Sequence, residues 1–114
     1  MEENIPKEYL EVAKGLKAKH GEVTVLYVKK KDGTDSVVYL AEPKRHQKMA
    51  IIDEYLSTKA KTQAGALLIE SCMIPEVSDK AVLVESTEND KVFLAMCMKA
   101  MNVIDFYDCE LKKN

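Results

Sequence analysis

Hydrophobic residues near the start of the chain recur with the spacing of an amphipathic helix. The apolar positions of this stretch are Tyr9, Leu10, Ala13 and Leu16. Pro6 suits the first turn of such a helix, and Gly21 suits the position just past its end. The pattern predicts an N-terminal helix over residues 6–19, which lies on the surface of the domain because its apolar stripe is narrow.

Residues 22–41 have the pattern of an antiparallel β-hairpin. Two runs of β-branched and aromatic residues, Val23–Val28 and Ser36–Leu40, flank the pair Asp32-Gly33, whose residues tolerate the positive φ angles of a tight turn. Both runs place apolar side chains on both of their faces. We therefore expect a sheet that is covered on both sides, or one whose second face meets another subunit.

A helical period follows over residues 44–108. After Pro43, the apolar positions Met49, Ile52 and Leu56 follow the 3.6-residue repeat and are expected on the inward side of a helix that begins near Arg45. A second helix is expected from Thr62 to Cys72, with Gly65 allowing a close approach of another backbone. Its inward residues are predicted to be Ala64, Leu67, Leu68 and Cys72.

The last helix is expected to begin near Asn89 or Asp90 and to be the central buried helix, because it is apolar nearly all round. The preceding segment, residues 76–89, fits a short strand, a helical turn or a loop. We therefore predict one α+β domain over residues 1–114. It consists of an N-terminal helix, an antiparallel β-hairpin, and a bundle of three or four helices packed on that hairpin.

Composition removes several classes of function. The chain has 17 basic and 19 acidic residues, a net charge of −2, and Arg45 as its single arginine, so neither nucleic acid nor a membrane surface is an expected partner. No apolar run approaches the ~20 residues of a membrane span, and residues 1–20 have no secretory apolar segment. Three cysteines without a CxxC pair indicate free thiols in the cytoplasm: Cys72, Cys97 and Cys109.

The residues that could carry catalysis are sparse. His20 fits a helix C-terminus, where an imidazolium interacts favourably with the helix dipole. His46 is the one candidate for a small enzyme, but the chain has no nucleophile elbow, His-x-x-x-His pair or glycine-rich phosphate loop to accompany it. We therefore expect no catalytic residue, no cofactor and no metal site, with an enzyme using His46 as the weaker alternative.

Two features indicate protein contacts. Methionines fill cores and adaptable interfaces, and the last helix is rich in them. Arg45 lies in a first helical turn, where a cation opposes the dipole unless it reaches an acid of the domain or of a partner. The candidate interface residues are Val25, Tyr27, Tyr39, Arg45, Met96, Met98 and Met101.

The order of elements also carries a resemblance. The segments Tyr39–Arg45 (YLAEPKR), Ala64–Cys72 (AGALLIESC) and Asn89–Ala95 (NDKVFLA) resemble small tail assembly chaperones of phages and prophages, over residues 22–105. The resemblance implies a non-enzymatic, mostly helical protein with a short sheet, whose partners are tape-measure and tail-tube proteins. That family has no fixed catalytic set, so the resemblance assigns a role to no residue.

The alternative from another class is a stand-alone structural or regulatory module that forms a homo-oligomer through its sheet or last helix. The two hypotheses differ in their gene neighbourhood. A tail assembly chaperone is expected between a tail-tube gene and the gene of a very long coiled-coil protein, whereas a stand-alone module is not.

Overall fold

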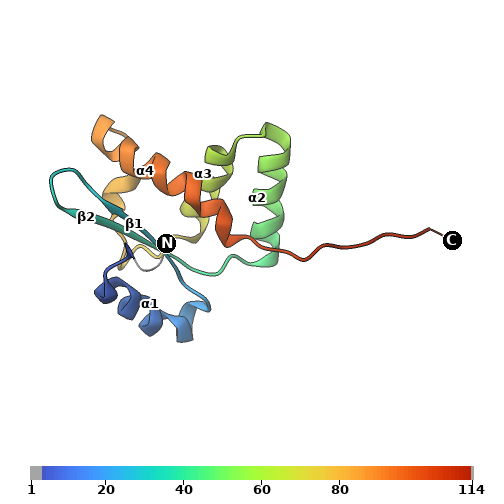
Figure 1. The fold of residues 1–114 in the computed structure, drawn as a ribbon, viewed down its shortest axis with the longest axis horizontal. Coiled ribbons are helices and arrows are strands. Elements are labelled where there is room, and N and C mark those ends of the chain that lie inside the picture. Colours follow the sequence, from blue (N-terminus) through green and yellow to red (C-terminus); the bar gives the residue numbers. More distant parts are fainter. Residues whose placement is uncertain (1–3, 114) are drawn as a thin grey trace.

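The structure of the chain is a computed structural model that describes residues 4–113. Its elements, in chain order, are α1 (Lys7–His20), β1 (Thr24–Lys29), β2 (Asp35–Leu40), α2 (Arg45–Thr58), α3 (Lys61–Cys72), the 3₁₀ helix η2 (Lys80–Leu83), α4 (Thr87–Ala100) and the 3₁₀ helix η3 (Met101–Val103). The hairpin lies between α1 on one side and the other helices on the other side (Figure 1). The predicted α+β class and order of elements are confirmed.

The β-hairpin forms as its turn residues require. Strands β1 and β2 pair antiparallel, with Leu26 opposite Val38. At the turn, the Lys30 amide donates to the Thr34 carbonyl at 2.8 Å, and Gly33 has a φ of 91°, which suits glycine. The Asp32 carboxylate accepts hydrogen bonds from the amide and the hydroxyl of Thr34. The prediction of a hairpin with a turn at Asp32-Gly33 is therefore confirmed.

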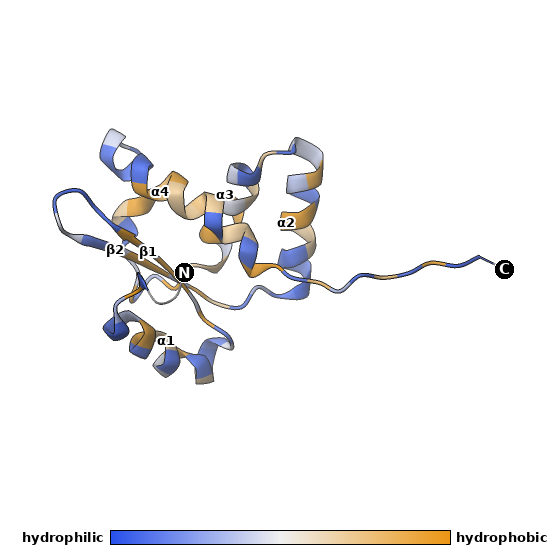
Figure 2. Ribbon diagram, viewed as in Figure 1, coloured by the Kyte–Doolittle hydropathy of each residue, from blue (hydrophilic) through white to orange (hydrophobic). Residues whose placement is uncertain are grey.

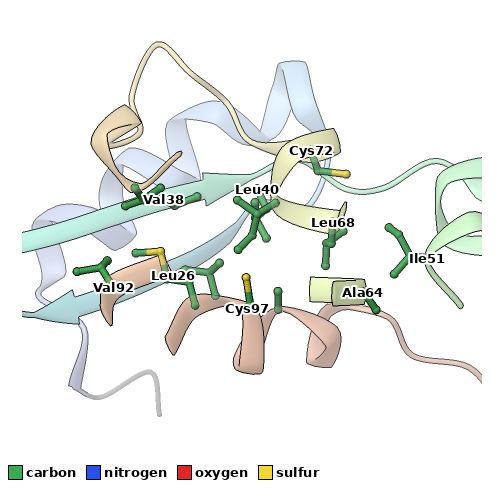
Figure 3. Close-up of a cluster of buried hydrophobic side chains, with 13 residues drawn as sticks. Leu26, Val38, Leu40, Ile51, Ala64, Leu68, Cys72, Val92 and Cys97 are labelled. Carbon is green, nitrogen blue, oxygen red and sulfur yellow. The ribbon is translucent and has the colours of Figure 1, made fainter. Parts of the chain in front are cut away.

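The two faces of the hairpin belong to separate cores, as alternation along a strand dictates. Leu26, Val38 and Leu40 face α3 and α4, and together with residues of the helices they form the larger core (Figure 3). Val37 and Tyr39 face the opposite way, toward α1, and form the smaller core with Ala13 and Ile74. The sheet is thus covered on both sides by its own chain, which is the first of the two expectations from the sequence.

α1 caps the smaller core from outside. It spans Lys7–His20, within one residue of the prediction, and ends at Gly21, whose φ is 74° and whose amide donates to the Lys17 carbonyl at 2.9 Å. Ala13 is its one buried residue, while Tyr9 and Leu16 are half-buried against the sheet. The narrow apolar stripe therefore places α1 on the surface, as predicted.

Helices α3 and α4 approach closely at Gly65. A Cβ atom at this position would overlap the backbone carbonyl of Cys97, so only glycine fits the contact. Leu68 and Ile69 are fully buried nearby. The predicted role of Gly65, close approach of another backbone, is confirmed.

Residues 72–79, which lead into the undecided segment 76–89, cover the outer edge of β2. The Ala41 amide donates to the Cys72 carbonyl, the Ile74 amide to the Tyr39 carbonyl, and the Asp79 amide to the Val37 carbonyl, all at 2.8–2.9 Å. The chain then forms η2, which Asp79 caps by accepting from the Ala81 amide. Residues 72–79 thus complete the hydrogen bonding of β2, and η2 buries Val82 in the larger core.

The last helix differs from the prediction in its position and its burial. α4 begins at Thr87, where the Ser86 hydroxyl accepts from the Asn89 amide, and it ends at Ala100 rather than continuing to residue 108. Its buried residues lie on one side: Val92, Met96, Cys97 and Ala100. The expectation of a central helix buried all round is therefore wrong. Beyond η3, β-branched and aromatic residues are weak helix formers, and after Ile104 the side chains up to residue 113 are exposed.

Candidate protein-binding interface

Three of the predicted interface residues lie beneath α1. Val25 pairs with Tyr39, and Tyr27 with Val37, so Val25, Tyr27 and Tyr39 share the face of the hairpin that α1 covers. Tyr39 is 2% exposed and is therefore a core residue rather than part of a free surface. Val25 and Tyr27 are half-buried in the same cluster.

The three predicted methionines point in different directions. Met96 is 2% exposed and packs in the larger core, which corrects its assignment to a surface. Met101 is half-buried against the same core. Met98 lies on the opposite side of α4 and is 57% exposed, with Leu94 four residues before it also exposed. Only Met98 of this group therefore has the exposure that a binding residue needs.

Arg45 begins α2 and is exposed. Within residues 4–113 it forms no ion pair, although Lys48, one turn later, lies 2.8 Å from Glu42. The first turn of α2 contains no acidic residue. The structural salt bridge considered from the sequence is therefore not seen within the described chain, and the partner contact remains a prediction.

An apolar stripe on α2 is exposed, although the sequence pattern predicts that it faces inward. The buried residue of α2 is Ile51. Met49 and Leu56 point away from it and are 59% and 55% exposed, with Ile52 half-buried beside them. We call these three residues the α2 stripe. Their spacing was visible in the sequence, but a single helix face cannot by itself indicate whether the domain core or another protein covers it.

α2 presents this stripe from the edge of the molecule. It is a 14-residue helix that packs on α3, and hydrophobic bands interrupt its hydrophilic surface (Figure 2). At its start the Lys44 amide donates to Gln47 Oε1 at 2.8 Å. At its end Lys59 is left-handed, with a φ of 58°, and its amide donates to the Tyr55 carbonyl. Both ends are thus capped, so the helix is well defined at the surface.

Asp35 holds α1 on the hairpin through two tyrosines. The hydroxyls of Tyr9 and Tyr27 donate to its two carboxylate oxygens at 2.9 Å and 3.0 Å, and Lys29 lies 3.8 Å away. The Tyr9 hydrogen bond is the main cause that lowers the pKa of Asp35. The same bond raises the pKa of Tyr9 to about 12. This cluster orients α1, and nothing in its geometry supplies a nucleophile.

The thiols and histidines do not form a reactive group. Burial raises the pKa of the Cys72 thiol and raises that of Cys97 to about 11, so both remain protonated and weakly nucleophilic. Cys72 and His20 line a shallow cleft of about 330 Å³, in which the Cys72 sulfur lies 3.9 Å from Gln47 Oε1. His46 is exposed and forms no hydrogen bond with a described side chain.

Residues 4–113 contain neither a metal-binding cluster nor a membrane-spanning helix. Within this range no three or more His, Cys, Asp or Glu side chains are grouped closely enough to hold a metal ion. None of the described helices combines the length and the apolar character that crossing a membrane requires.

Neither a protein-family model, nor a curated protein, nor a solved structure matches this chain significantly. Function is therefore inferred from the surfaces that the fold leaves exposed.

Proposed function

We propose that this chain is a non-enzymatic protein-binding chaperone or adaptor, and that the α2 stripe binds an amphipathic helix of its partner. The observation that carries the proposal is the exposure of Met49 and Leu56 on the side of α2 opposite Ile51. A capped helix that presents apolar residues one and two turns apart is suited to helix-against-helix recognition. Methionine and leucine adapt to many partner surfaces, as a chaperone requires.

The exposed area is large enough to matter for affinity. Complete burial of a Leu or Met side chain contributes roughly 1.5–3 kcal/mol, and more than half of Met49 and of Leu56 is still exposed. Covering both would therefore contribute about 2–3 kcal/mol, which corresponds to roughly a 30- to 150-fold change in the dissociation constant. A charge at either position would oppose this burial.

The partner class that we propose comes from the resemblance of residues 22–105 to phage and prophage tail assembly chaperones. In that family the partners are a tape-measure protein, which is long and helical, and tail-tube subunits. A helical client is the kind of partner that the α2 stripe suits. We accordingly place the protein in the cytoplasm, where it would coat its client before assembly.

Co-purification with the proposed client tests this function. The chain would be co-expressed with the long coiled-coil protein encoded beside its gene, and the double variant Met49→Glu, Leu56→Glu would be compared with Ala50→Glu. Ala50 is exposed on α2 but lies about 100° around the helix from Met49, so its variant adds a charge beside the stripe. We expect the double variant to lose the client and the control to retain it.

Two results would overturn the proposal. One is a client that binds the double variant as tightly as the unmodified chain. The other is a gene neighbourhood with neither a tail-tube gene nor a long coiled-coil gene, which would favour the alternative of a stand-alone homo-oligomeric module. One observation favours that alternative independently, namely the open edge of β1.

A further inference from the structure

The outer edge of β1 has backbone groups without a partner in residues 4–113. Val37 and Tyr39 use their outward backbone groups to bond residues 74–79, so their partners on β1, Tyr27 and Val25, also direct their amides and carbonyls outward. On that side, no backbone group of residues 4–113 bonds to Val25 or Tyr27. β2 is thus completed by its own chain, whereas β1 is left as an open edge, which readily pairs with another strand.

This edge lies in a groove between two helices. The groove has a volume of about 1090 Å³ and runs along Val23–Val28. One wall is formed by α1, which contributes Leu10 and Lys14, and the other by α4 and η3, which contribute Lys99 and Val103. An extended segment entering the groove would therefore meet backbone hydrogen-bonding groups at its base and apolar side chains on both walls.

The chain also has an extended segment whose side chains are exposed from Asp105 onward. Residues 104–113 leave η3 without helical structure and extend away from the body (Figure 1). Phe106, Tyr107 and Leu111 are 76%, 97% and 86% exposed. Ile104, Phe106 and Tyr107 are residue types typical of strands, and the segment contains neither Gly nor Pro. We call residues 104–113 the C-terminal tail.

The charges of the groove and of the C-terminal tail are complementary. The groove is lined by four lysines and two glutamates, namely Lys7, Lys14, Lys17, Lys99, Glu11 and Glu22. Lys14 and Lys17 are paired with Glu11 and Glu22, while Lys99 forms no ion pair with a described residue. The tail places Asp105, Asp108 and Glu110 among its apolar residues, and its two lysines, Lys112 and Lys113, follow at the far end. An apolar strand with acidic residues therefore suits a β edge flanked by lysines.

We infer that the groove receives the C-terminal tail of a second copy of this chain as an added β-strand, which produces a homodimer with exchanged tails. Each copy presents one groove and one tail, so a reciprocal exchange around a two-fold axis satisfies both. The tail is already extended, and its ten residues reach about 33 Å, which exceeds the roughly 20 Å of the exposed β1 edge. Addition of a strand to a sheet edge is an established mode of recognition.

The groove suits the tail of a second copy better than the tail of its own chain. Ile104 packs against the larger core of its own molecule, and the C-terminal segment then extends away from the body (Figure 1). Val103, the residue before the tail, already lines that groove, so an intramolecular return would require an immediate reversal of the chain. The residues that follow it, Ile104 to Tyr107, include three β-branched or aromatic residues and no glycine, which disfavours a tight turn.

The oligomeric state of the full chain tests this inference. Sedimentation velocity would be measured over a range of concentrations with Cys109→Ser throughout, because the exposed Cys109 could otherwise link two copies covalently. We expect a reversible dimer. Deletion of residues 105–114 should give a monomer, and Phe106→Asp should weaken the dimer by at least about tenfold. Val84→Asp is the matched control, since Val84 is exposed outside the groove, and it should leave the dimer unchanged.

A complementation experiment tests the groove itself. Val25→Pro removes an outward amide without removing a bond to β2, and the fold of the variant is checked by circular dichroism. Mixing the tail-deleted chain, which retains its groove, with the Val25→Pro chain, which retains its tail, should produce a mixed dimer with one tail in one groove. If Val25→Pro fails to fold, Tyr27 N-methylation in a semisynthetic chain removes the equivalent outward amide.

The remaining outcomes overturn the inference. A chain that is monomeric at all concentrations would mean that the tail binds its own groove or another protein. A dimer that persists after the tail is deleted would place the interface elsewhere. The α2 stripe is not part of this groove. A monomeric chain would therefore contradict the dimer but not the proposed function, and client binding that survives in the α2 double variant would contradict the proposed function but not the dimer.

Discussion

Asp35 and Gly65 show how single residues determine the packing of whole elements. Asp35 accepts hydroxyl hydrogen bonds from Tyr9 of α1 and Tyr27 of β1, so one carboxylate joins a helix to the sheet. Gly65 lets α3 approach the backbone of α4 at Cys97. Asp35 acts through its charge, whereas Gly65 acts through the absence of a side chain. A different measurement therefore tests each of them.

The carboxylate of Asp35 should make the docking of α1 depend on pH. Its pKa in the folded chain is below the ordinary value of 3.8, so its contribution to stability is fully present above that value and is lost as the pH falls through the lowered pKa. Tyr9→Phe removes the main cause of the shift. We expect the difference in unfolding free energy between Tyr9→Phe and the unmodified chain to be largest at neutral pH and to shrink in acid.

Urea unfolding monitored between pH 7 and pH 2 measures this difference. Tyr55→Phe is the control, because the Tyr55 hydroxyl forms no hydrogen bond with a described residue. A gap between Tyr9→Phe and the unmodified chain that stays constant with pH would show that Tyr9 acts through packing alone.

Gly65→Ala should destabilise the fold by about 1–3 kcal/mol, because the added methyl group overlaps the Cys97 carbonyl and forces α3 and α4 apart. Gly15→Ala provides the comparison. Gly15 lies within α1, and nothing lies within 4 Å of a Cβ atom built there, so alanine should stabilise by about 0.4–1 kcal/mol. Denaturant unfolding of both variants measures the contrast. Equal effects would contradict the close contact at Gly65.

At the scale of elements, α2 is the helix whose buried face differs from the face that the sequence pattern predicts. The residues Met49, Ile52 and Leu56 have a clear helical period, yet the structure buries Ile51 instead and leaves Met49 and Leu56 exposed. α2 packs mainly on α3 and therefore needs only a small apolar contact. Its more regular apolar face is available to another protein.

Truncation of single side chains on α2 tests which face is inward. Ile51→Ala should lower the free energy of unfolding by about 2–5 kcal/mol, because Ile51 is fully buried. Met49→Ala should change it by no more than about 0.5 kcal/mol, because the side chain is largely in solvent. The reverse order, measured by denaturant unfolding of the isolated chain, would mean that the predicted inward face is correct after all.

Local signals explain which elements the sequence could predict. The hairpin was predictable because Asp32-Gly33 lies between two β-branched runs, and the boundaries of α1, α2 and α3 followed from Pro6, Gly21, Pro43 and Pro75. The end of α4 could not be predicted, because the segment from Met101 to Ile104 continues the apolar character of the helix. α4 ends because, within the described chain, no element lies where a longer helix could pack. This depends on tertiary structure, which a local pattern does not reveal.

The candidate site could be predicted less well than the fold. Tyr39 and Met96 were expected on a surface because they are adaptable or aromatic residues in apolar runs, but both are core residues. Met98 lies on the exposed side of α4, and Arg45 is exposed at the start of α2. Residue type alone could not separate these four, because burial depends on which side of an element faces its neighbours.

At the scale of the whole molecule, the fold completes its core and leaves apolar side chains exposed, among them those of the α2 stripe and the C-terminal tail. The largest dimension of the described chain is 60 Å, against 33 and 24 Å in the other directions, and the tail lies along this longest axis. The stripe is on α2, while the groove for the tail runs along β1 between α1 and α4. The proposed client binding and the inferred self-association would therefore use separate surfaces.

Photo-cross-linking at the α2 stripe tests the central proposal most directly. A photoreactive p-benzoylphenylalanine would replace Leu56 in one chain and Leu94, an exposed leucine on α4, in another, and each would be irradiated with the long coiled-coil client. We expect the client to be captured from position 56 and not from position 94. Capture from position 94 alone, or from neither position while the client still co-purifies, would contradict binding through α2.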